Sequence, residues 1–172
     1  MELKTQRLVL RPVSTDDFDT TYEYITDPEN CRYMVFLPLE SEQETVDFLR
    51  EAQEEWKKPS PSFYEAAVVY NRRHIGCVSL YLSDDRLSAE IGWIINKRYQ
   101  RQGFAYEAAS ALVVYAAQLG IRHLTAHCDT ENTGSRRVME KLGMTLTGEH
   151  GGRKNRLSDE ERREYQYEMD LT

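Results

Sequence analysis

The stretch Gln100-Arg101-Gln102-Gly103-Phe104-Ala105 decides how this chain is interpreted. It follows an apolar run, residues 89–95, and it opens residues 104–119, whose apolar side chains recur at helical spacing. A strand that ends in a short turn and continues as a helix leaves several N–H groups unpaired at the helix start. Those donors and the positive end of the helix dipole suit a pyrophosphate, and Gly103 lets it approach closely.

Three phosphate-binding patterns compete for this turn. A P-loop requires Gly-x4-Gly-Lys-Ser/Thr, which the sequence does not contain. A dinucleotide fold requires Gly-x-Gly-x-x-Gly after the first strand of a βαβ unit, whereas this turn has one glycine and lies past the middle of the chain. The third pattern, Gln/Arg-x-x-Gly-x-Gly/Ala, matches Gln100, Gly103 and Ala105. The sequence therefore favours the third pattern.

Motifs on both sides of the turn identify that pattern. Downstream, Asn132-x-x-Ser135 precedes Val138-Met139-Glu140-Lys141-Leu142-Gly143-Met144, and Gly148-Glu149 follows. Upstream lies Thr5-x-Arg7-Leu8-x-Leu10-Arg11-Pro12. In this order and spacing the motifs resemble the GNAT superfamily of N-acetyltransferases, and within it the ribosomal-protein N-acetyltransferase (RimJ/RimL-like) branch. The resemblance covers nearly the whole chain.

Length and composition indicate one ordinary domain, residues 1–172. The chain is 40% hydrophobic and 30% charged. No apolar run approaches the ~18 residues of a membrane helix, and the N-terminus has no signal-peptide apolar region, so we expect no membrane association. The three cysteines, Cys31, Cys77 and Cys128, have no metal-site spacing. They favour unpaired thiols in a reducing cytoplasm and no bound metal.

The net charge of −7 disfavours nucleic acid as the main ligand and is compatible with a cationic amine substrate. Against that acidic background, Lys97, Arg98 and Arg101 cluster beside the glycine turn. They are either phosphate contacts or a solvated basic loop, and the sequence leaves both open.

Periodicity and capping residues predict the elements. Ser14 and Ser41 each start a helix, and residues 104–119 and 133–142 form two more. The expected strands are residues 3–13, 63–70, 74–82, 87–95, 123–128, 144–149 and 164–170. We therefore predict an α/β fold: a single-domain GNAT-like α/β sandwich on a mixed central sheet of about seven strands with about four helices, in the order β-α-α-β-β-β-α-β-α-β-β.

The resemblance implies where acyl-CoA binds. The cofactor would lie in a V between residues 87–95 and 123–128, which would be neighbouring parallel strands that splay apart. Backbone groups of the first strand would pair with the pantetheine amides, and the glycine turn would hold the pyrophosphate. The expected cofactor-binding residues are Trp93, Ile94, Ile95, Arg98, Arg101, Gln102, Gly103, Phe104, Ala105, Tyr106, Asn132 and Ser135.

Two residues are candidates for the chemistry. Glu90 would take the proton of the amine, since burial in its apolar strand would raise its pKa; the alternative is a structural ion pair. Many family members carry a tyrosine as general acid where this chain has Met139. Ser135 is the expected replacement, with its hydroxyl near the departing sulfur, or else it bonds its own helix.

The acceptor pocket is the least determined part. The family often builds it from the loop before the second helix, so Tyr33, Phe36 and Tyr64 are candidate walls, although such aromatics also cover cores. The sequence thus predicts a cytoplasmic, acetyl-CoA-dependent N-acetyltransferase that acts directly on a primary amine, either a protein N-terminal α-amine or a small molecule. The alternative is a non-catalytic acyl-CoA-binding sensor. A homodimer is left open.

Overall fold

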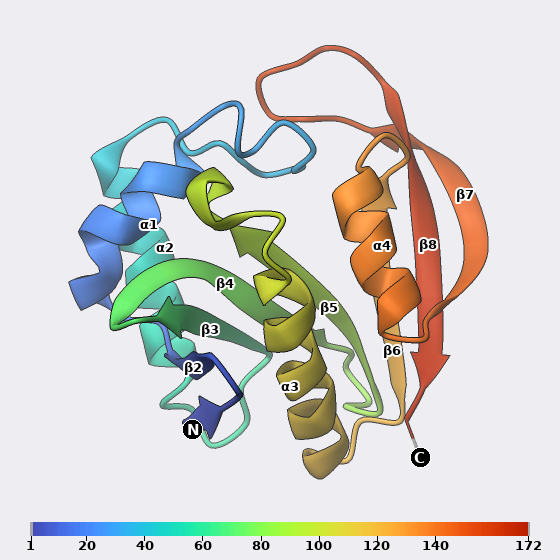
Figure 1. Cartoon of the computed structure of the whole chain (residues 1–172), viewed down its shortest axis with the longest axis horizontal. Coiled ribbons are helices and arrows are strands. Elements are labelled where there is room, and N and C mark those ends of the chain that lie inside the picture. Colours follow the sequence, from blue (N-terminus) through green and yellow to red (C-terminus); the bar gives the residue numbers. More distant parts are fainter. Residues whose placement is uncertain (1, 172) are drawn as a thin grey trace.

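The computed structural model describes residues 2–171 (Figure 1). The strands and helices follow one another as β1 (Leu3–Lys4), β2 (Leu8–Pro12), η1 (Thr15–Asp17), α1 (Phe18–Ile25), α2 (Glu42–Glu55), β3 (Phe63–Tyr70), β4 (Arg73–Leu82), β5 (Ser88–Ile95), η2 (Lys97–Tyr99), α3 (Phe104–Gln118), β6 (His123–Asp129), α4 (Thr133–Lys141), β7 (Thr145–Arg153) and β8 (Arg162–Asp170). The predicted mixed α/β sandwich with four α-helices is confirmed.

The sheet has eight strands in the order β1-β2-β3-β4-β5-β6-β8-β7, one more than predicted. The segment predicted as one strand, residues 3–13, contains two strands. The chain turns after Lys4, where the Thr5 N–H donates to Leu8 C=O at 3.0 Å. Leu3 then pairs with Leu10 in an antiparallel hairpin. All neighbouring strands are antiparallel except β5 and β6.

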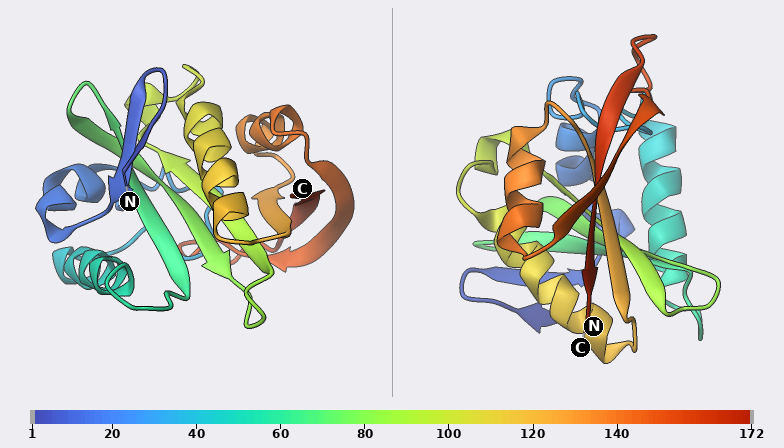
Figure 2. Two further views of the ribbon diagram at one scale, coloured as in Figure 1. Left: turned by 90° about the horizontal axis from the view of Figure 1, so that it is seen from below. Right: turned by 90° about the vertical axis from the view of Figure 1, so that its right-hand side faces the viewer.

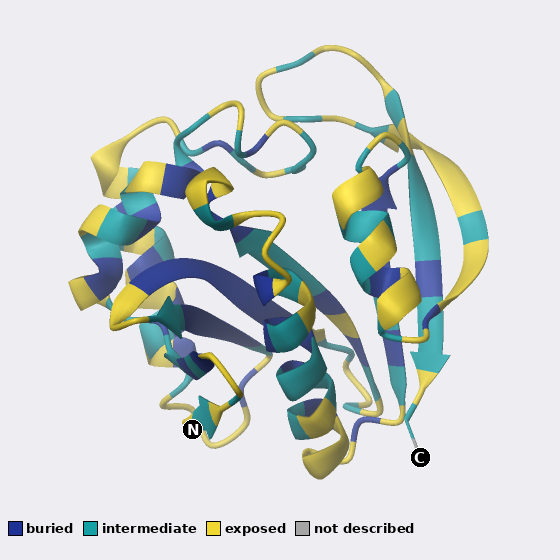
Figure 3. Ribbon diagram, in the orientation of Figure 1, coloured by how far each residue is buried: buried dark blue, intermediate teal, exposed yellow. Residues whose placement is uncertain are grey.

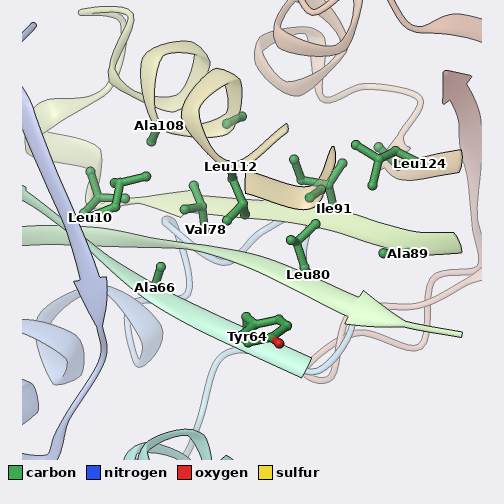
Figure 4. Packing of buried hydrophobic residues seen from close by; sticks show 14 of the residues in the cluster. Leu10, Tyr64, Ala66, Val78, Leu80, Ala89, Ile91, Ala108, Leu112 and Leu124 are labelled. Carbon is green, nitrogen blue, oxygen red and sulfur yellow. The ribbon is translucent and has the colours of Figure 1, made fainter. Parts of the chain in front are cut away.

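Helices cover both faces of the sheet (Figure 2). The main core lies between the sheet and α3, where Leu10, Val78, Ile91 and Leu112 are all buried (Figure 4). A smaller cluster around Leu49 packs α2 on the opposite face. Figure 3 shows that burial is concentrated in β3 and β4, while β7, the outer strand, is mostly exposed.

Local sequence signals act as expected at most element ends. The Ser41 Oγ accepts from the Glu44 N–H at 3.2 Å and begins α2. The Glu44 carboxylate accepts from the Glu40 N–H rather than from Ser41, so Ser41 and Glu44 form only half of a capping box. Gly120, with φ 85°, follows the end of α3.

Candidate active site

Strands β5 and β6 part, as the resemblance predicts. They are paired only through Ser88–His123, Ala89–Leu124 and Glu90–Thr125. Beyond Glu90, β5 stays on β4 as far as Ile95, whereas β6 stays on β8 as far as Asp129. Figure 1 shows the two strands side by side at one end and diverging at the other. The inner edges of both strands are therefore open beyond Glu90.

The β5 backbone groups that face the opening belong to alternate residues. Ser88 C=O and Asn96 N–H bond to β4 or its flanks, whereas Leu87 C=O bonds to the start of β6. Because the register with β4 has no bulge, odd-numbered residues present their N–H and C=O groups to the opening. Trp93 and Ile95 fit the predicted role. The prediction for Ile94 is corrected, since its backbone faces β4 and its side chain packs toward the α2 cluster.

One carbonyl of the opening already has a partner. Gln100, the first residue of the glycine turn, donates its Nε2 to Ile95 C=O at 2.9 Å. This bond ties the turn to the end of β5. Ile95 therefore offers its N–H to a ligand, while Trp93 offers both N–H and C=O.

The glycine turn presents a run of unpaired donors. None of residues 101–106 donates its backbone N–H to a hydrogen bond within residues 2–171, and the first bond of α3 runs from Glu107 N–H to Gly103 C=O at 3.0 Å. Arg101 and Gly103 have φ of 61° and 83°, a left-handed geometry that turns successive N–H groups outward. With the dipole of α3 behind them, unpaired donors in this arrangement suit an anion.

Arg7, for which the sequence predicts no role, contacts the glycine turn through its guanidinium group. Its Nη1 donates to Gln102 C=O at 3.0 Å, and its guanidinium carbon lies 4.5 Å from the centre of the Phe104 ring. Its Nε donates to Glu107 Oε2 at 2.7 Å. Since the C=O and N–H of a trans peptide point in opposite directions, fixing the Gln102 carbonyl aims the Gly103 N–H outward. No local pattern could reveal a contact across 95 residues.

The basic residues beside the turn divide into two groups. Lys97 Nζ lies 2.7 Å from Asp27 and 2.6 Å from Glu29, so it fastens η2 to the loop after α1. Arg98 and Arg101 are exposed at the turn. Lys141 on α4 lies 5.9 Å from the ring centre of Tyr106, a further cation near the start of α3. The geometry leaves Arg98 and Arg101 as cofactor candidates.

Glu90 differs from the expectation in one respect. Its side chain is 52% exposed, so the burial that the sequence predicts for it is not found. The Glu90 side chain lies on the α2 face of the sheet, 3.3 Å from Nδ1 of His127 on β6. This carboxylate raises the pKa of His127 above its ordinary 6.5. The pair sits where β5 and β6 separate, so a proton-accepting group does lie at the opening.

A second acid lies on the same face of the sheet. Tyr81, the cross-strand neighbour of Glu90, donates its hydroxyl to Glu65 Oε1 at 2.6 Å. Glu65 is buried, which raises its pKa to about 7 despite that bond. A polar row therefore crosses β3, β4, β5 and β6 beneath the opening.

The start of α4 places the second expected pair. Asn132 caps the helix, accepting from the Ser135 N–H at 3.0 Å. Ser135 is half-buried in the first turn, so its hydroxyl remains a candidate for the departing sulfur. Met139 is buried in the main core, and its thioether has no proton to donate.

Two of the three predicted pocket residues remain available. Tyr33 lies in the loop between α1 and α2, with the Arg162 guanidinium carbon 5.6 Å from its ring centre, and Phe36 is 84% exposed. The prediction for Tyr64 is corrected. It is buried in the main core between Trp56 and Tyr115, because β3 turns its even-numbered residues toward α3.

The loop that carries Tyr33 is fastened to the end of the β7–β8 hairpin. Asn155 Nδ2 donates to the carbonyls of Cys31 and Met34 at 2.9 and 2.8 Å, and Arg153 donates to Tyr33 C=O at 2.8 Å. A cavity of about 200 Å³ lies beside this junction, lined by Pro28, Arg32, Asn155, Ser158, Glu160 and Arg162. The polar connection after β7 thus supports the loop between α1 and α2.

The three cysteines are poorly suited to covalent catalysis. Cys31, Cys77 and Cys128 are buried, and burial raises the pKa of Cys128 to about 11, which makes a thiolate nucleophile unfavourable. Within residues 2–171 no group of three His, Cys, Asp or Glu side chains is arranged to hold a metal ion. No helix in the described chain is long and apolar enough to cross a membrane.

A parted pair of parallel strands beside a helix start with unpaired N–H groups is the arrangement that the resemblance predicts for acyl-CoA-dependent transferases. The family model for the acetyltransferase (GNAT) domain matches residues 7–145, and the chain belongs to this family. It is an acetyltransferase enzyme.

Individual relatives agree with this assignment. The chain is 30% identical over 152 residues to an uncharacterized N-acetyltransferase, YnaD, of Bacillus subtilis strain 168, covering 86% of this chain and 85% of that protein. A GNAT-family acetyltransferase structure from Bacillus anthracis is 26% identical and superposes with a TM-score of 0.85 over 99% of this chain and 98% of its own. The ribosomal L7/L12 α-N-protein acetyltransferase RimL, solved with coenzyme A, has the same fold at 16% identity, with a TM-score of 0.86 over 99% and 98% of the two chains.

Proposed function

We propose that this protein transfers an acetyl group from acetyl-CoA directly to a primary amine, either a protein N-terminal α-amine or a small-molecule amine. The observation that carries the proposal is the run of unpaired N–H groups at residues 101–106 beside the parted strands β5 and β6. The turn would bind the diphosphate of the cofactor. Trp93 and Ile95 would bond the pantetheine arm in the opening, which would bring the thioester toward the Glu90–His127 pair.

The residues at the opening fit an α-amine better than a lysine side chain. At pH 7, neutralising a lysine amine of pKa ~10.4 costs about 4–5 kcal/mol, whereas an α-amine of pKa ~7.7–8.0 costs about 1 kcal/mol. The carboxylate–imidazole pair is a mild base, which matches the smaller cost. RimL, whose name specifies an α-amine of a ribosomal protein, has the same fold, which supports a protein acceptor.

The first test is the glycine turn. Gly103→Glu would place a carboxylate where the diphosphate binds, and its Cβ would lie 3.4 Å from Arg7 Nη2. Gly120→Glu is the matched control, because Gly120 has nearly the same φ (85° against 83°) and no atom within 4 Å of an added Cβ. We expect isothermal titration with CoA to show a loss of affinity of at least ~100-fold for the first variant only, with both folded by circular dichroism. Unchanged affinity in Gly103→Glu would contradict the site.

The second test separates an enzyme from an acyl-CoA sensor. Thiol release from acetyl-CoA would be measured with a short peptide bearing a free N-terminus, a blocked peptide bearing one lysine, and a panel of small amines. The proposal expects turnover with α-amines ahead of lysine. Tight CoA binding without turnover on any amine would favour the sensor.

A further inference from the structure

Glu90 and His127 form a pair where strands β5 and β6 separate. Glu90 is the last β5 residue paired with β6, and its partner there is Thr125. His127 stands two residues further along β6, so its ring lies on the same face and at the edge of the opening. The distance from Glu90 Oε1 to His127 Nδ1 is 3.3 Å, and the imidazole is 23% exposed.

Both strands beside β6, which are β5 and β8, carry charged or polar side chains near His127. Glu90 faces it from β5, and Gln166, its cross-strand neighbour, faces it from β8. Glu164 on β8 lies near the imidazole but is paired with Arg153 of β7 at 2.6 Å. His150 on β7 is bonded to Gln166 at 3.1 Å. The strongest of these influences is Glu90, and together with Glu164 and Gln166 it raises the pKa of His127.

Resting on the function proposed above, we infer that His127 is the group that accepts the amine proton, and that Glu90 is a positioning residue which holds its ring. Nδ1 is the ring nitrogen that lies 3.3 Å from the Glu90 carboxylate, so we assign the proton-accepting role to Nε2. Glu90 alone is a half-exposed carboxylate, a weaker base than an imidazole at neutral pH.

The transfer then balances in atoms and charge. Nε2 of His127 takes one proton from the ammonium group, the free amine nitrogen forms its bond to the acetyl carbon, and the carbon–sulfur bond breaks. The CoA thiolate leaves with the electron pair of that bond and takes up the second proton that the nitrogen loses, and the imidazolium returns its proton to solvent.

The test compares a residue-specific titration with the kinetics. The pKa of His127, from NMR of isotopically labelled histidine in the CoA complex, should match the pKa on the acid limb of kcat. In Glu90→Gln both values should move to lower pH together, because the carboxylate that raises the His127 pKa is gone. His127→Gln should lower kcat by about 10²–10⁴-fold and remove that limb. Glu90→Gln should lower kcat by a smaller factor than His127→Gln.

His123→Gln is the matched control. His123 lies on the same strand and face, paired with Asp170 at 2.8 Å, but away from the opening. Its loss should leave the rate and the pH profile unchanged. If His127→Gln keeps the acid limb while Glu90→Gln removes it, Glu90 itself is the base and the inference is overturned, although the function stands. A kinetic pKa that stays fixed while the NMR value moves also overturns it. An enzyme that bound CoA but acetylated no amine would overturn both.

Discussion

Arg7→Ala should weaken cofactor binding without touching the cofactor site directly. Arg7 bonds the Gln102 carbonyl, pairs with Glu107 at 2.7 Å and covers the Phe104 ring. The hydrogen bond to the Gln102 carbonyl stabilises the fold by ~0.5–1.5 kcal/mol. The partly exposed ion pair with Glu107 contributes ~0.2–1 kcal/mol, and the cation–π contact with Phe104 contributes ~0.5–1 kcal/mol. We expect Arg7→Ala to lower the free energy of unfolding by about 1–3 kcal/mol, measured by urea denaturation.

The larger consequence concerns binding. Without Arg7, the peptide group between Gln102 and Gly103 is free to rotate, and the binding of CoA must then fix its orientation. Fixing one residue costs ~1–2 kcal/mol, so the Kd for CoA should rise by about 5- to 30-fold. Arg50→Ala is the control, since Arg50 is an exposed arginine paired with Asp47 at 3.2 Å, on α2 and outside the cofactor site. A folded Arg7→Ala protein that binds CoA as tightly as the wild type would refute this reasoning.

Two further predictions concern charge. Arg101→Ala should raise the Kd for CoA by about threefold to tenfold and weaken its dependence on salt, whereas Lys97→Ala should not, because Lys97 is held by Asp27 and Glu29; titrations at two ionic strengths would check this. Burial would raise the pKa of Asp129, but bonds from Arg162 and the Glu131 N–H outweigh it and hold that pKa below 3.8. The stability from the Asp129–Arg162 pair is therefore complete above pH ~4 and is lost as the pH falls through the folded pKa of Asp129. In Asp129→Asn the free energy of unfolding should depend less on pH in that part of an acid-unfolding curve, and it should be lower by about 2–3 kcal/mol at pH 7.

Local sequence patterns predicted most helices and strands, because each pattern depends on residues that are only a few positions apart. Strand β3 has the predicted bounds, and α3 begins at the predicted Phe104. The first strand was less well predicted, because the turn at Thr5 depends on bonds to Leu8 and to Glu107 on α3. A contact across 102 residues leaves no periodic trace in the sequence.

The site shows the same division. The glycine turn could be predicted because a strand, a glycine and a helix start are consecutive in the chain. For Tyr64, the sequence could not decide between pocket and core, since only the packing of α3 on the sheet shows which face of β3 is covered. The burial expected for Glu90 also failed, because the α2 face of β5 is partly open to solvent at that residue.

The sequence by itself determined the family, the order of the elements and the position of the glycine turn before α3, since these depend on short-range patterns. Only the tertiary structure brought Arg7 under Gln102 and His127 beside Glu90. The reason is physical: the parallel pairing of β5 with β6 joins segments separated by a whole helix, and its register, set by packing against α3 and β8, decides which side chains meet where the strands part.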